Sequence, residues 1–459
     1  SRPKAHLFAF AIMALFIFVF LGSEYHFDIA YGELAGPDSV VGAQASILAA
    51  SAIGLVGYSL VNRTAAAKHR SILAGMLGAA STLLVIATQL TQNASTLLSL
   101  GCLLFLILGM LGNATYFSVA LTHFASRSLS RLVGTSYAAG LLAQFLLHSL
   151  APNSIVEAAI IGVSAIALGF VLAARRNVLH VIPVEGTLPE EDQRTADERA
   201  ALKEAILLLV CVSLIACVFS TLDNVVTLAN AQGTFDLSTW PRLLLAASAI
   251  AAGFAFDLTN HRYSTITMLC VAMLSLVSGL AIRTDSEVLL GLVIFYLSSG
   301  FFVVFFTSSF LRIAMRCANP SLWAGMGRAA NNACASLVAI PSIALISSGD
   351  IMLISSVTIA LAMATLLVAH ALENARRTAR HKAEIEALKL AELTAAQATN
   401  PKPETAAETE APIEESAPDS HLAAFSERYS LTPRERDVLS AVCSSEETLQ
   451  CIADDMGIS

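Results

Sequence analysis

The sequence predicts an all-α, polytopic membrane protein, and three observations carry that prediction. Only 14% of the 459 residues are charged, whereas 56% are hydrophobic. Soluble domains carry about 25% charged residues, so a water-exposed surface cannot be built from so few charges. Apolar stretches of membrane-spanning length recur along most of the chain, and basic residues recur in alternate connections between them. Helices are expected because lipid offers no partner to open backbone groups.

The apolar stretches number about twelve, each long enough for a helix to cross the hydrocarbon core. They form two groups of about six, separated by a polar connection at 175–203. The predicted spans are 6–22, 40–61, 71–90, 96–118, 131–151, 154–174, 204–224, 241–257, 264–282, 288–311, 326–347 and 351–371. The first half of the protein is therefore placed at 1–174, the central cytoplasmic loop at 175–203 and the second half at 204–371.

Basic residues favour one side of the predicted bundle. They precede the first span and occupy every second connection: Arg2, Lys4, Arg63, Lys68, Arg70, Arg127, Arg131, Arg175, Arg176, Arg262, Arg312, Arg316, Arg376 and Arg377. The opposite connections are poorer in basic residues, and the one after the first span is acidic, with Glu24, Asp28, Glu33 and Asp38. The positive-inside rule and the even number of predicted spans then place both termini in the cytoplasm. The expected location is the inner membrane of a prokaryote.

Two six-helix groups joined by a cytoplasmic loop resemble the major facilitator superfamily. The segment GFAFDLTNHR at 253–262 resembles a loop signature of that family, in which an aspartate at a helix end holds a cytoplasmic gate. This resemblance implies a gate role for Asp257 and Arg262. The corresponding segment of the first half contains Gly57 and Arg63 but lacks the aspartate, and a solvated loop charge is the alternative for Asp257.

Polar residues inside the predicted spans mark a candidate ligand cavity, because ionisable groups are costly in a membrane. The candidates are Gln144, His148, Asp223, Asn224, Asn331 and Asn332. Asn113 lies in the fourth predicted span, and Arg328 opens the eleventh. The amides have an alternative role in hydrogen bonds between helices, and Asp223 and His148 lie close enough to a span end for contact with water to be the alternative. The alternative for Arg328 is to snorkel to the membrane interface.

The residues after the last predicted span change in character. Residues 372–399 are rich in Ala, Glu, Lys and Leu, which favours a cytoplasmic helical extension. Its irregular heptads leave a homodimer open without requiring one. Residues 400–420 are rich in Pro, Glu, Ala and Thr, and this composition predicts a disordered acidic linker.

Residues 421–459 predict two short helices. Thr432 and Glu435 have capping-box spacing, and Gly457 is a suitable helix terminator. The stretches LTPRERDVL and IADDMGIS resemble the opening of the LuxR-type (NarL/FixJ-like) DNA-binding family. The resemblance implies a helix-turn-helix scaffold made of Leu431, Thr432, Arg434, Glu435, Val438, Leu439, Ile452, Ala453, Gly457 and Ser459. The family's recognition helix would follow Ser459, so the domain is expected to be truncated here.

These features predict a membrane-embedded one-component transcriptional regulator as the main function. Its membrane domain would sense a small ligand, and its complete C-terminal domain would bind DNA. The alternative is a major-facilitator-type secondary transporter with a regulatory tail, and a passive membrane anchor with a protein-binding tail is a third reading. The sequence has no Walker loop, nucleophile elbow or metal-spaced His/Glu set, so no enzyme activity, cofactor or metal is expected.

Overall fold

The protein is built from helices in the part of the chain that its computed structural model describes, which is residues 2–64, 67–174, 191–233, 241–258, 264–281 and 288–399. The chain divides into two units, Ser1–Ala387 and Leu388–Ser459. In the second unit, the described residues are the last turns of a long helix. All-α architecture is therefore confirmed for the described residues, and the predicted linker at 400–420 lies outside them.

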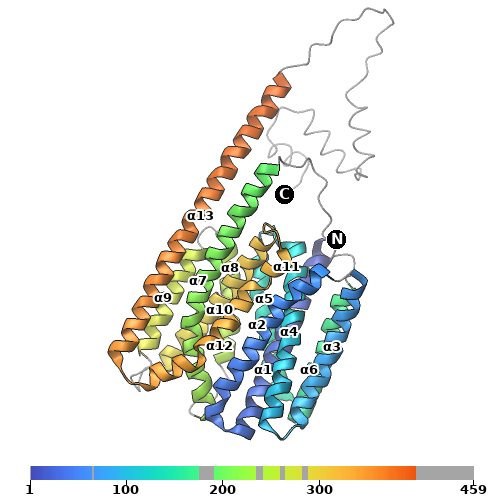
Figure 1. Cartoon of the computed structure of the whole chain (residues 1–459), viewed down its shortest axis with the longest axis vertical. Helices are drawn as coiled ribbons and strands as arrows, with labels where there is room; N and C mark the ends of the chain where they lie inside the picture. Colours follow the sequence, from blue (N-terminus) through green and yellow to red (C-terminus); the bar gives the residue numbers. More distant parts are fainter. Residues whose placement is uncertain are drawn as a thin grey trace, which may run out of the picture. The chain divides into compact units, whose positions relative to one another are not determined.

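The helices follow the predicted spans closely (Figure 1). The first half contains α1 (Arg2–Ala35), a 3-10 helix η1 (Pro37–Ser39), α2 (Val40–Thr64), α3 (Ala67–Leu90), α4 (Ala94–His123), α5 (Leu129–Leu150) and α6 (Ser154–Ala174). The second half contains α7 (Glu191–Ala231), α8 (Pro241–Leu258), α9 (Ser264–Ala281), α10 (Val288–Ala314), α11 (Pro320–Trp323), α12 (Met326–Ser347) and α13 (Ile351–Thr399). Each predicted span coincides with one of these helices.

Eight helices in the described residues are long and apolar enough to cross a membrane, so the chain is a polytopic membrane protein. Shorter apolar stretches lie in α8 and α9. Two helices that coincide with predicted spans, α5 and α12, are not among the eight. Both contribute residues to the lining of a cavity. A total of about twelve spans stays a prediction.

Two helices are longer than the hydropathy predicts. Helix α1 has 34 residues, and it continues beyond the predicted end of its span until Gly36, whose φ of 87° is unfavourable for other residues, and Pro37. Glu24, Asp28 and Glu33 therefore lie on a helix, and their assignment to a loop is wrong. Helix α7 begins at Glu191, so the end of the predicted central loop is helical as well.

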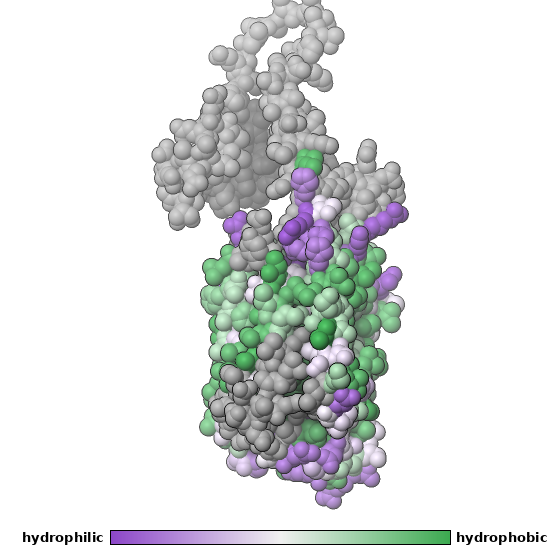
Figure 2. Space-filling view, turned by 90° about the vertical axis from the view of Figure 1, so that its left-hand side faces the viewer, coloured by the Kyte–Doolittle hydropathy of each residue, from purple (hydrophilic) through white to green (hydrophobic). Residues whose placement is uncertain are grey.

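Apolar side chains cover the wall of the bundle, as a lipid environment requires. Figure 2 shows hydrophobic residues along its middle and hydrophilic residues gathered toward its two ends. Met352, Ile359 and Leu367 on α13 are each more than half exposed, although they are apolar. In water such a surface would drive association, whereas in a bilayer it costs nothing.

Contacts between the halves are made by a few helices. Helix α5 of the first half packs on α8 of the second, and α2 packs on α12. We call the end at which α1 begins the amino-terminal end of the bundle, and the end at which α1 stops the distal end. Helices α5 and α12 start toward the amino-terminal end, while α2 and α8 start at the distal end. In each of these two pairs, therefore, the helices from the two halves run in opposite directions.

Candidate functional site

A cavity of about 570 Å³ lies between the halves. Its walls come from α1, α2 and α5 of the first half and from α7, α8, α10 and α12 of the second. The lining runs from Arg328 and Phe302 in the middle of the bundle to Glu33 and Pro37 at the distal end. Its size falls within the usual range of small-molecule sites.

The amino-terminal end of the bundle is closed by a contact between α5 and α8. Asp257, at the end of α8, accepts hydrogen bonds from the backbone N–H groups of Ser130 at 3.1 Å and Arg131 at 2.9 Å. The Arg131 guanidinium also donates to it at 3.1 Å, and Arg312 of α10 lies 3.9 Å away. The carboxylate thus binds the positive start of α5. Because its side chain is only 2% exposed, water screens these contacts little.

Close approach of the backbones reinforces this closure. A Cβ atom added to Gly134 of α5 would lie 2.2 Å from the carbonyl oxygen of Ala249 on α8. One added to Gly253 would lie 2.7 Å from the carbonyl oxygen of Ser130. Arg312 Nη2 also donates to the carbonyl of Ser126 across the halves, at 3.2 Å. Larger residues at these glycines would hold the halves apart.

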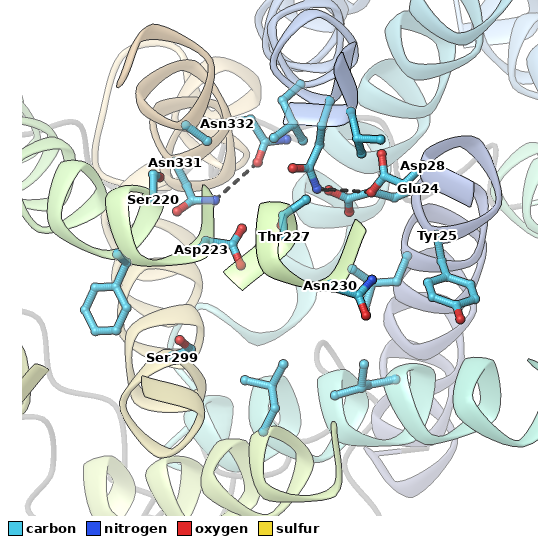
Figure 3. Close-up of a pocket in the computed structure, with 18 of the residues that line it drawn as sticks. Glu24, Tyr25, Asp28, Ser220, Asp223, Thr227, Asn230, Ser299, Asn331 and Asn332 are labelled. Carbon is cyan, nitrogen blue, oxygen red and sulfur yellow. Dashed lines mark hydrogen bonds between the residues drawn. The ribbon is translucent and has the colours of Figure 1, made fainter. Parts of the chain in front are cut away.

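The cavity wall on α1 carries a pair of carboxylates held by one amide. Gln44 Nε2 of α2 donates to Glu24 Oε1 and to Asp28 Oδ2, both at 3.2 Å. Figure 3 shows these two acidic residues on one side of the pocket and Asp223 of α7 on another. Positions 24 and 28 are one helical turn apart, so both side chains face the same way. The pair makes a negatively charged patch on this wall.

Asparagines connect the floor of the cavity to the neighbouring helices. Asn332 of α12 donates to Ser51 Oγ of α2 at 2.8 Å, across the two halves. Asn331, beside it, donates to the Asn332 side chain at 3.3 Å (Figure 3). Outside the lining, Asn113 of α4 donates to the carbonyls of Leu55 and Ser321, at 2.5 and 2.8 Å. These amides fix the helices around the cavity floor.

Arg328 lies in the cavity floor and is only 7% exposed. Its guanidinium carbon lies 5.0 Å from the centroid of the Phe20 ring, which is a cation–π contact. Within the described residues, no hydrogen bond or ion pair joins Arg328 to another group, and its Nε atom is buried. The residue therefore does not snorkel to a membrane interface.

A buried ionisable cluster adjoins the cavity through Tyr25. Glu157 Oε2 of α6 lies 3.1 Å from His26 Nε2 and 3.2 Å from His148 Nδ1. The other nitrogen of His148 is 3.0 Å from the hydroxyl of Tyr25, which lines the cavity. The cluster joins α1, α5 and α6 within the first half. No group of three or more His, Cys, Asp or Glu side chains is placed to hold a metal ion in the described part of the chain.

The structure brings four of the predicted ligand residues into one cavity: Gln144, Asp223, Asn331 and Asn332. The other two lie behind its wall. His148 contacts Tyr25, and Asn224 donates to Ser342 of α12 at 3.1 Å. Of the predicted gate, Asp257 lies in the closed end, whereas Arg262 falls outside the described residues.

The acidic pair on α1 is absent from the residues that the sequence predicts for the site. Glu24 and Asp28 follow an apolar stretch, which predicts a loop, yet no helix-breaking proline occurs between that stretch and Pro37. Their i, i+4 spacing was the available signal for a charged helical face.

Solved structures of transporters match this arrangement. The chain is similar to the human organic anion transporter MFSD10 (TETRAN), with 14% identity and a TM-score of 0.56, over 81% of this chain and 99% of that one. It is also similar to a bacterial homologue of the iron transporter ferroportin in an outward-facing state, with 11% identity and a TM-score of 0.58, over the same shares. The chain shares its fold with these transporters. No protein-family model and no curated protein sequence matches the chain.

These matches correct the main interpretation of the sequence, which was a DNA-binding transcriptional regulator. The matching structures are transporters, and the comparisons give no support to a LuxR-type domain or to DNA as a partner. Capping boxes and apolar stripes occur wherever an amphipathic helix begins, so a short match can specify helices without specifying DNA binding. The proposed scaffold residues lie outside the described residues: Leu431, Thr432, Arg434, Glu435, Val438, Leu439, Ile452, Ala453, Gly457 and Ser459.

Proposed function

We propose that the protein is a secondary transporter that moves a small polar solute across a membrane by alternating access. The observation that carries this proposal is the cavity between the halves, which reaches the distal end while Asp257 closes the amino-terminal end. A binding site that both halves share can change its exposure when one half rocks against the other. The similarity to transporter structures adds support.

We place the protein in the inner membrane of a prokaryote, with both termini in the cytoplasm. The bias of Lys and Arg toward connections at the amino-terminal end supports this orientation. In that orientation the cavity faces outward, in keeping with the outward-facing state of the ferroportin homologue. A regulatory tail would then follow α13 on the cytoplasmic side.

Labelling from each side of the membrane tests this function. The eight native cysteines are first replaced, and Thr227→Cys or Ser299→Cys then places one thiol in the cavity wall. A membrane-impermeant maleimide should react from the outside, and more slowly from the cytoplasmic side of inverted vesicles. Asp257→Asn should accelerate the cytoplasmic reaction.

A control thiol should behave differently. Ser348→Cys, in the exposed connection between α12 and α13, should react from the outside only. If the cavity thiols never react from the cytoplasmic side, even with Asp257→Asn, the cavity does not change access and the transporter proposal is wrong.

A further inference from the structure

The cavity holds one buried cation, Arg328, that makes no hydrogen bond or ion pair with a side chain of the described residues. Arg328 is more than nine-tenths buried, its closest described contact is the face of Phe20, and the charge of Asp223 acts on it without forming an ion pair. Burial of a charge without an ion-pair partner is costly, so a protein that keeps such a charge commonly uses it. The planar guanidinium fork matches a carboxylate, with two parallel N–H···O bonds. Arg328 is therefore suited to an anionic group of a ligand.

The rest of the lining has the opposite charge. Glu24, Asp28 and Glu33 of α1 and Asp223 of α7 all line the cavity, and Arg328 is the one basic residue among the described lining residues. The charge of Asp223 interacts with those of Glu24 and Arg328. This excess of negative charge disfavours a ligand that carries only anionic groups.

The charged groups lie at different depths. Arg328 is level with Phe20, whereas Glu24 and Asp28 follow on the same face of α1. At 1.5 Å per residue these carboxylates lie about 6 and 12 Å farther along the helix axis. The α-ammonium and α-carboxylate groups of an amino acid lie on adjacent carbons, so these two charges alone cannot reach both places. A longer molecule can, and the cavity volume of about 570 Å³ admits one.

We infer that the cavity binds a small zwitterion whose carboxylate pairs with Arg328 and whose ammonium group lies against Glu24 and Asp28, several bonds away. A zwitterion offers an anionic group to Arg328 and a cationic group to the carboxylates of Glu24 and Asp28. A pure cation would leave Arg328 unpaired, and a pure anion would face the four carboxylates. This inference deepens the proposed function by naming the solute class.

The inference is tested by measuring how four probes, which differ in their charged groups and in the distance between them, bind to the full chain in lipid nanodiscs. The probes are 6-aminohexanoate, glycine, hexanoate and hexylamine, measured by calorimetry at one pH and ionic strength. We expect 6-aminohexanoate to bind at least about tenfold more tightly than the other three. Equal binding of hexanoate or hexylamine overturns the zwitterion, and equal binding of glycine overturns the charge separation.

Variants assign the two ends of the ligand. Arg328→Met should remove the advantage of 6-aminohexanoate over hexylamine, and Glu24→Gln should reduce its advantage over hexanoate. Arg328→Lys keeps the charge but loses the fork, so it should weaken 6-aminohexanoate binding several-fold. Arg377→Met and Glu373→Gln, which alter an i, i+4 pair outside the cavity, should leave binding unchanged.

The melting temperature shows whether a variant still folds, and the thiol labelling separates failure of the zwitterion site from failure of the transporter proposal. Without ligand, Arg328→Met should melt no lower than the unaltered protein, because it removes a buried charge that has no ion-pair partner. If none of the probes binds while the cavity thiols still react from both sides, the solute class is wrong and the transporter proposal stands. If 6-aminohexanoate binds as expected but the thiols react from one side only, the zwitterion site stands and transport does not.

Discussion

Two buried carboxylates toward the amino-terminal end of the bundle each contact two arginines, but they connect different parts of the protein. Asp257 of α8 binds Arg131 and the backbone at the start of α5, so its contacts cross between the halves. Glu204 of α7 binds Arg316 and Arg376, each at 2.9 Å, and these contacts stay within the second half. Carboxylate–arginine contacts therefore join the two halves at Asp257 and stabilise the second half at Glu204.

The difference shows that charge pairing in this bundle must be interpreted by what it joins. A contact between the halves changes the balance between two conformations, because it exists in only one of them. A contact within one half is present in both, so it changes stability alone. Arg376 also donates to Thr265 of α9 at 2.7 Å, which ties three helices of the second half together.

Gly134→Ala should have the largest effect on the distance between the halves at the amino-terminal end. It disturbs the contact of α5 with α8 beside Asp257 without altering a charge. The new methyl group would meet the carbonyl oxygen of Ala249, and overpacking against backbone costs up to about 3 kcal/mol. Spin labels at Arg127→Cys and Leu258→Cys should move apart in pulsed electron resonance distances. Gly57→Ala, whose added carbon meets open space, is the matched control and should leave the distance unchanged.

Asp257→Asn should have the second-largest effect. It weakens charge-assisted hydrogen bonds, so the equilibrium between the two conformations should shift by about 2 kcal/mol toward the state that is open at the amino-terminal end. The same label pair should show a second, longer distance. An unchanged distance distribution would mean that Asp257 does not hold the halves together. The melting temperature should change less than the distances do.

Glu204→Gln should do the opposite of Asp257→Asn: it should lower stability and leave the distance between the halves unchanged. Loss of its two arginine contacts should lower the free energy of unfolding by about 1 kcal/mol, because Arg316 is half exposed and partly screened. The distances between the halves should stay as they are. A new distance population in this variant would remove the distinction between the two carboxylates.

Arg377→Met should have the smallest effect. Arg377 lies on α13, is mostly exposed and pairs with Glu373 at 3.4 Å one turn away. Such pairs contribute about 0.3 kcal/mol, so neither the melting temperature nor the distances should change measurably. A clear loss of stability would show that surface pairs cannot serve as the reference for the buried ones.

The sequence predicts the helices well, because lipid selects long apolar segments and hydropathy reports them directly. It predicts the cavity only partly. Gln144, Asp223, Asn331 and Asn332 stand out as polar residues within apolar segments. Glu24 and Asp28 do not, because a hydropathy window treats the first charged residues after an apolar stretch as the end of a span.

Contacts between distant residues account for most of what the sequence could not predict. Asp257 stands out through its motif, yet its partner Arg131 is 126 residues away and no local spacing reveals it. Arg328 looks like an interfacial residue, since it opens a predicted span. The short helix α11 and its contact with Asn113 place the start of α12 inside the bundle instead.

The most direct test of the account is whether the two ends of the bundle open in alternation. One label pair, Arg127→Cys with Leu258→Cys, reports on the amino-terminal end, and a second, Ala35→Cys with Met352→Cys, reports on the distal end. The account predicts that Asp257→Asn lengthens the first distance and shortens the second in the same population. Lengthening of the first distance with no change in the second would contradict it.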